Sequence, residues 1–232
     1  MQHIIRTLIL AAGIGCVQQY GYAQDKTQGV IYYDITYHIH ASLKPDQMQY
    51  KDLVPETVVE KAELKYKGQR LKAYFNDDIK NDQDGVNTSI KVSSEDGNEK
   101  YADIDRKTLW WVDKAKTPPV LVEKSLFEKN EDQGKETESA ETQQILGYSC
   151  KKLIIKSKNG PLTIWYTTEL PLKAGTPASV FTDKGVVLAL DSKRISFKAT
   201  SIEFVPVTEK EVTPPADLKT VKNSEHKGIQ PF

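Results

Sequence analysis

The chain has 232 residues, of which 38% are hydrophobic, and its 32 basic and 32 acidic side chains cancel to a formal net charge of zero. This balance gives no charge bias toward nucleic acids or anionic membranes, so we expect neither as a partner. The length suits one domain with a full-sized core.

The first 23 residues have the layout of a secretory signal peptide. A basic start precedes an apolar run over residues 7–17, which is shorter than the about 20 residues that a membrane-spanning helix needs. Small residues fit cleavage after Ala23, so we predict a periplasmic or otherwise exported protein with no transmembrane segment in the mature chain. The alternative is a lipoprotein anchored through Cys16, although the residues before it fit a lipoprotein signal poorly.

Residues 30–43 predict the first strand of the mature chain, because their apolar side chains alternate with polar ones. The apolar face is expected to hold Ile31, Tyr33, Ile35, Tyr37, Ile39 and Ala41. The opposite face carries His38 and His40 beside Asp34, and histidines two apart on a strand can turn toward one metal ion. No motif supplies the further ligands, so we expect a solvated strand face and no metal site.

The region after this strand breaks the alternation. Pro45 and Pro55 exclude a continuous helix, so we expect residues 56–63 either to form a short helical turn or to enter the next strand. Alternating runs then flank Gly68 and the Asp-Gly pair at 96–97, and both positions predict hairpin turns.

Residues 127–144 are nearly all polar or charged, so we expect an exposed loop there. Beyond it come a hairpin that turns at Asn159-Gly160 and further alternating segments, after which the periodicity is lost. We therefore predict a signal peptide over residues 1–23, one β-rich domain over 24–215 and a C-terminal tail over 216–232.

Cys150 is the one cysteine expected in the mature chain, so it has no disulfide partner there. A catalytic thiol would need a nearby base and a lowered pKa, which nothing around Cys150 in the sequence supplies. Tyr148 and Cys150 share one side of the strand pattern, whereas Leu153 and Ile155 share the other. We predict that Cys150 packs in the core and that a β-bulge or sharp twist near Lys151 reconciles the two sets.

Two pairs of adjacent aromatic residues, Trp110-Trp111 and Trp165-Tyr166, are the candidate ligand-binding residues. Neighbours on a strand point to opposite faces, so one member of each pair should lie in the core. The other member either stacks on a ligand or covers an edge of the sheet.

Several runs in the C-terminal half carry a family resemblance. "ILGYSCKKL", "IWYTTELPL", "KGVVLAL" and "ATSIEFVPV" with "VTPPADLK" together resemble the exported GLPGLI/DUF4412-type families of Bacteroidetes. These families have no established catalytic residues to transfer. The resemblance implies a β-rich fold similar to the curved, incompletely closed sheets of envelope lipoprotein carriers such as LolA, which hold an apolar ligand on the concave face.

The sequence therefore predicts a mainly β protein: a single strongly curved antiparallel sheet or incomplete β-barrel of roughly eight to eleven strands, with one or two short helices. We expect an exported cell-envelope binding protein that holds a lipid-like or other apolar ligand on the concave face. The alternative is an envelope interaction module that partners an outer-membrane protein and takes no small-molecule ligand. Because no catalytic constellation is visible, we expect no enzyme, no catalytic residue and no cofactor.

Overall fold

The structure is a computed structural model that describes residues 24–75, 78–83, 86–91, 97–127, 133–157, 160–177 and 180–223. The predicted signal peptide, with Cys16 and Ala23, lies outside these residues, so cleavage, lipidation and export stay predictions. In chain order the strands are β1 (Gln28–His38), β2 (Thr57–Lys67), β3 (Arg70–Phe75), β4 (Asp78–Gln83), β5 (Val86–Lys91), β6 (Glu99–Asp103), β7 (Thr108–Asp113), β8 (Val120–Ser125), β9 (Gln133–Ile145), β10 (Tyr148–Ser157), β11 (Leu162–Thr167), β12 (Val186–Asp191), β13 (Ile195–Glu203) and β14 (Lys219–Lys222).

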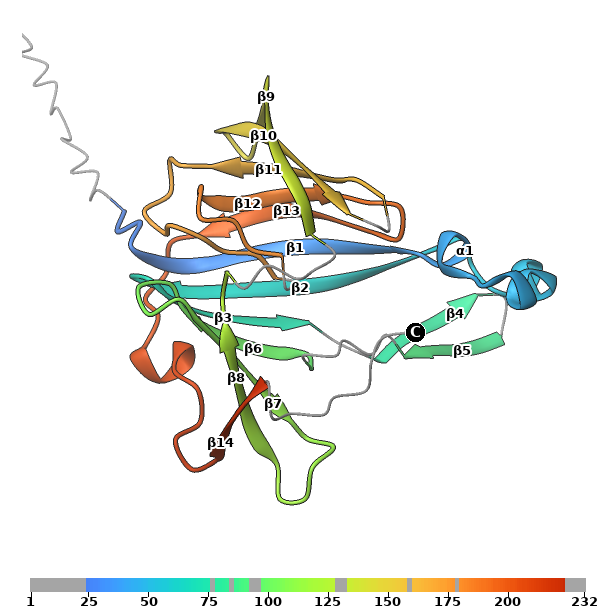
Figure 1. Cartoon of the computed structure of the whole chain (residues 1–232), viewed down its shortest axis with the longest axis horizontal. Coiled ribbons are helices and arrows are strands. Elements are labelled where there is room, and N and C mark those ends of the chain that lie inside the picture. The colour runs from blue at the N-terminus through green and yellow to red at the C-terminus, as the bar shows by residue number, and fades with distance from the viewer. Residues whose placement is uncertain are drawn as a thin grey trace, which may run out of the picture.

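One curved, unclosed sheet dominates the molecule (Figure 1). It has 12 strands in the order β14-β8-β7-β6-β3-β2-β1-β13-β12-β11-β10-β9, and β4 and β5 form a separate hairpin. All neighbours in the large sheet are antiparallel except β14 and β8, which pair in parallel. The predicted fold class is confirmed, although the strands outnumber the eight to eleven expected.

Helices are short and lie at the ends of the sheet. They are α1 (Ile39–Ser42), η1 (Pro45–Leu53) and η2 (Glu209–Val212), the last two being 3-10 helices. In the part of the chain that the structure describes, no helix has the length and apolar character to cross a bilayer. Of the two alternatives for residues 56–63, the strand is confirmed and the helical turn is wrong, because β2 starts at Thr57 and buries alternate side chains along that stretch.

Three further expectations differ from the structure. The first strand stops at His38, where α1 begins, so Ile39 and Ala41 leave its apolar face. Asp96 of the turn predicted at 96–97 lies outside the described residues, and the strands on either side of it do not form a hairpin with each other, because β5 pairs with β4 whereas β6 pairs with β3. The loop predicted over 127–144 is replaced from Gln133 by β9, an exposed edge strand that its backbone pairing with β10 holds in place.

The two faces of the sheet differ in chemistry. We call the inner face the one that carries Ile31, Tyr33 and Leu64, which are fully buried, and the outer face the one that carries Lys65 and Lys67. On the inner face the Tyr33 ring meets Phe197 edge-on, with ring centroids 5.8 Å apart, and the Tyr33 hydroxyl donates to the Val187 carbonyl at 3.0 Å. The buried tyrosine therefore packs as an aromatic and satisfies its polar atom at the same time.

The described part of the connection from β11 to β12, which we call the plug (residues 168–177 and 180–185), packs against this inner face. It contributes the buried side chains Leu170, Leu172 and Ala174 to the core. A methyl group added at Gly175 would come within 3.2 Å of the Leu64 side chain, so the plug lies directly against β2. The Gln69 side chain ties the plug down, since its amide nitrogen donates to the Pro171 carbonyl at 2.9 Å and its oxygen accepts from the Lys173 backbone at 3.0 Å.

The chain after β13, which we call the strap (residues 204–222), runs along the outer face and ends as β14 beside β8 (Figure 1). Its buried side chains are Val207 and Val212. Lys67 donates to the Val207 carbonyl at 2.7 Å, and Lys65 lies 3.2 Å from the Glu211 carboxylate. Part of the segment predicted as a tail over 216–232 thus pairs with the sheet, while the predicted domain boundaries stay predictions.

Leu172→Ala tests how much the plug contributes to the core. The Leu172 side chain is 1% exposed, so its truncation should lower the free energy of unfolding by about 2–5 kcal/mol. The matched control is Leu53→Ala, because Leu53 is 76% exposed and its loss should change stability by about 0.5 kcal/mol or less. Urea unfolding of both variants measures the difference, and equal effects would show that the plug is not part of the core.

Glu211→Gln tests how the strap is held at its helical turn. Hydrogen bonds from the Thr208 backbone and hydroxyl, followed by the nearby Lys65, lower the Glu211 pKa from 4.5 to about 2. A carboxylate whose pKa is lower in the folded than in the unfolded state contributes its full stabilisation when the pH is above the unfolded-state pKa. That contribution is lost as the pH falls through the folded-state pKa. The melting temperature of Glu211→Gln should therefore lie below that of the parent at pH 7, and the gap should close between pH 4.5 and about 2. A gap that persists at the acidic end would contradict this origin.

Candidate functional site

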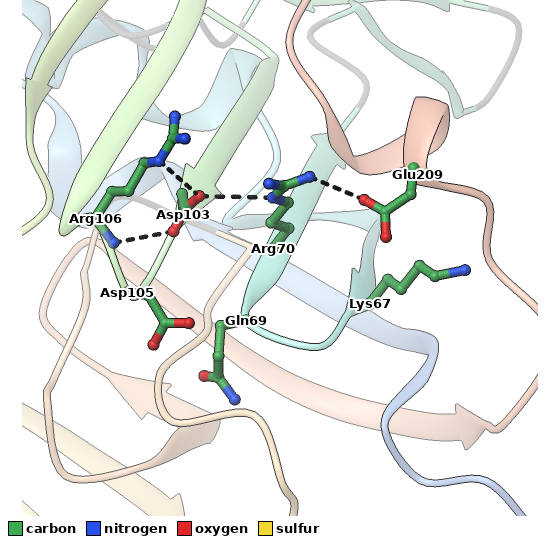
Figure 2. A pocket seen from close by; sticks show the side chains of 7 residues that line it. All are labelled: Lys67, Gln69, Arg70, Asp103, Asp105, Arg106 and Glu209. Atoms are coloured by element: carbon green, nitrogen blue, oxygen red, sulfur yellow. Dashed lines mark hydrogen bonds and ion pairs between the residues drawn. The ribbon is translucent and has the colours of Figure 1, made fainter.

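A polar pocket of about 360 Å³ opens on the outer face where the strap passes the β2–β3 and β6–β7 turns (Figure 2). Two turns and one helix end supply its walls. The lining residues are Lys67, Gln69, Arg70, Asp103, Asp105, Arg106 and Glu209.

Strand pairing builds the centre of this pocket. Arg70 begins β3 directly opposite Asp103, the last residue of β6, so the two side chains share one face. The two turns are also joined, because the Ile104 backbone N–H donates to the Gln69 carbonyl at 2.9 Å. Gly68 permits the tight β2–β3 turn, since its φ of +58° lies in the left-handed region.

Four of the charged side chains form a continuous chain across the pocket, as the dashed lines of Figure 2 show, whereas Lys67 and Asp105 stand outside it. Asp103 Oδ2 lies 3.7 Å from Arg106 Nε and 3.6 Å from Arg70 Nε, and Arg70 Nη1 donates to Glu209 Oε2 at 2.9 Å. Asp103 Oδ1 also accepts from the Arg106 backbone N–H at 3.0 Å. Asp103 is only 9% exposed, so this carboxylate is the buried centre that orients both arginines.

The formal charges of the lining cancel. Lys67, Arg70 and Arg106 stand against Asp103, Asp105 and Glu209, with Gln69 neutral between them. The pocket holds no histidine, cysteine or serine that could act as a nucleophile, and no group of three metal-binding side chains occurs among the described residues. What the lining offers is hydrogen-bond donors and acceptors in fixed positions.

The four aromatic residues predicted as ligand contacts lie elsewhere, on β7 and β11. Trp111 and Tyr166 are buried, whereas Trp110 and Trp165 are half-buried, which confirms that one member of each pair enters the core. The Trp110 indole donates to Glu123 at 2.9 Å, and Lys152 lies 5.6 Å above the Trp165 ring. None of the four lines the pocket, and their role in binding a ligand stays a prediction.

The two histidines that share a strand pattern are separated by the end of β1. His38 Nε2 lies 3.3 Å from the Ser196 hydroxyl, and His40, which belongs to α1, lies 3.0 Å from the Val54 carbonyl. Each imidazole thus has its own partner, and the arrangement does not direct both toward one point.

Cys150 packs in the core as predicted, since it is 0% exposed. Burial, followed by the nearby Glu169 carboxylate, raises the pKa of its thiol to about 11. The pairing of β10 with β9 shifts register between Lys151 and Leu153, where β10 exchanges its buried side. The predicted irregularity near Lys151 is therefore confirmed, and Cys150 is a core residue with a neutral thiol.

Little in the amino-acid sequence indicated the pocket. Arg70, Asp103 and Glu209 are far apart along the chain, and they meet only because β3 pairs with β6 and the strap returns over both. The hairpin turn predicted at Gly68 is confirmed as the β2–β3 turn, yet no feature of the sequence placed it beside residues 103–106.

Residues 127–225 match the family model described as N-glycanase peptide, N-terminal domain. Two solved structures of PNGF-II, in the C2 and P21 space groups, have TM-scores of 0.55 and 0.54 with 12% and 13% sequence identity. Each superposition covers 84% of this chain but only 30% and 31% of the PNGF-II chains, so this chain spans about a third of their length. At such low identity the likeness shows a shared fold. No curated protein matches the chain.

These matches correct two expectations. The resemblance to the GLPGLI/DUF4412 families and LolA carriers is wrong, because the C-terminal half that carried it matches an N-glycanase domain and the similar structures are PNGF-II. Its short runs are strands and turns of a curved sheet, which unrelated families share. The expectation that the protein is not an enzyme is contradicted by the same match, since the model describes a domain of an N-glycanase.

Thiol labelling tests the environment of Cys150. With a pKa of about 11 and no exposed surface, its thiol should resist iodoacetamide at pH 8 in the folded protein and react fully in denaturant. Peptide mass spectrometry distinguishes this site from Cys16. Cys150→Ser should cost about 1–2 kcal/mol, because it places a hydroxyl among apolar atoms. Rapid labelling of the native protein would contradict the buried thiol.

Proposed function

We propose that the chain is a domain that binds N-glycosylated protein and thereby assists an N-glycanase in removing N-linked glycans. The observation that carries this proposal is the match of residues 127–225 to the N-terminal domain of N-glycanase peptide. That range includes β9 to β13 and the strap, and it therefore contains Glu209 of the polar pocket.

The chemistry of the accessible surface favours a polar ligand in this role. The pocket is open to solvent and lined by charged and amide side chains, whereas the inner face near β1 is occupied by the plug residues Leu170, Leu172 and Ala174. A lipid-like ligand on the inner face and an outer-membrane protein as partner both stay predictions, as does the exported location.

Two assays on the purified chain test this proposal. In the first, the immobilised chain should retain an N-glycosylated protein and should not retain the same protein after its glycans have been removed. In the second, mass spectrometry follows glycan release from a glycopeptide by PNGF-II in the presence and absence of the chain, and by the chain alone. We expect release to rise when the chain is present. Equal retention of both protein forms, together with unchanged release, would overturn the proposal.

A further inference from the structure

The polar pocket has the features of a built binding site rather than a chance gathering of surface charges. Asp103 is buried at its centre and holds two arginines in place. Gln69 is fixed through both atoms of its amide, which bind the Pro171 carbonyl and the Lys173 backbone N–H. A ligand that enters therefore meets side chains whose positions are already set, which lowers the entropic cost of binding.

The charge pattern decides the class of ligand. An anion bound to Arg70 would lie beside the carboxylates of Asp103 and Glu209. These two carboxylates already lie 3.6 and 2.9 Å from the Arg70 guanidinium. A cation at Asp103 would likewise lie beside Arg70 and Arg106. In either case a like charge opposes the ligand, so the balanced lining favours a neutral one.

A neutral ligand gains most here if it both donates and accepts hydrogen bonds at closely spaced atoms. Guanidinium groups only donate, ionised carboxylates only accept, and the two alternate across this pocket. Neighbouring hydroxyl groups on a sugar ring match that alternation, because each hydroxyl can accept from an arginine and donate to a carboxylate.

We propose that this pocket binds the hydroxyl groups of a neutral sugar unit. The choice of a sugar among neutral polyols rests on the proposed function, and the pocket would then contact the glycan of the bound glycoprotein. The lining contains no aromatic ring on which a sugar could stack, so a single unit should bind weakly, with a Kd on the order of 1 mM.

Nuclear magnetic resonance titration of the ¹⁵N-labelled protein tests the pocket directly. The probes are N-acetylglucosamine as the neutral sugar, and glucuronate and inorganic sulfate as anions. N-acetylglucosamine should shift the Gln69 side-chain amide and the Ile104 and Arg106 backbone amides in a saturable way. Saturation by either anion at lower concentration than the sugar, or no shift at these amides with the sugar, would overturn the proposal.

Arg106→Gln is the informative variant, because the Arg106 side chain is 70% exposed and we expect its replacement to leave the fold in place. Loss of a charge-assisted donor should weaken sugar binding roughly tenfold or more. The matched control is Arg194→Gln, in the exposed turn between β12 and β13, which should bind like the parent. Equal sugar affinity in both variants would exclude the pocket as the site.

The two proposals fail in different ways. If the chain retains glycosylated protein and Arg106→Gln does so equally well, the pocket inference is wrong and the proposed function stands. If N-acetylglucosamine shifts the pocket amides but neither retention nor release depends on the chain, the proposed function is wrong and the pocket still binds a sugar.

Discussion

The structure depends on one requirement, which is that the apolar face of a very long sheet must leave water. Ile31, Tyr33, Leu64 and Tyr66 form a continuous row on the two central strands, and all four are fully buried. Helices cannot cover them, because the helices are short and lie at the margins of the sheet. The sheet instead curves around its own apolar face, and the plug fills space on that side.

The polar chemistry of the outer face follows from this burial of the inner face. Because most inward positions of β2 and β3 are apolar, polar side chains such as Lys65, Lys67 and Arg70 take the alternate positions on the outer face. The strap crosses them with only Val207 and Val212 to bury, so it is held mainly by ion pairs and hydrogen bonds. The polar pocket lies at the place where these contacts end and the two turns begin, which is why its walls are charged and fixed.

The sequence predicted those parts of the fold whose strands have one solvent-exposed and one buried face. The alternation over residues 31–37 and on both sides of Gly68 is strong, and these stretches lie in β1, β2 and β3. The first half of β2 was less clear, because the two prolines before it interrupt the pattern. Strand β9 was not predicted because, of its described side chains, only Ile145 at its end is buried, so no apolar face marks it. Backbone pairing with β10 makes it a strand. The pocket was not predicted for a different reason: its lining residues come from three places in the chain, and no local sequence pattern joins them.

The position of β1 has a consequence for the order in which the molecule can fold. Its two neighbours are β2, the next strand along the chain, and β13, which brings Val30 opposite Glu203. Until the last long strand has been synthesised, one edge of β1 therefore has no native partner and the two halves of the sheet cannot join. Pairings between such distant segments carry a high loop-closure entropy and slow the folding reaction. The central strand of the finished sheet is thus among the first to be made and among the last to be enclosed.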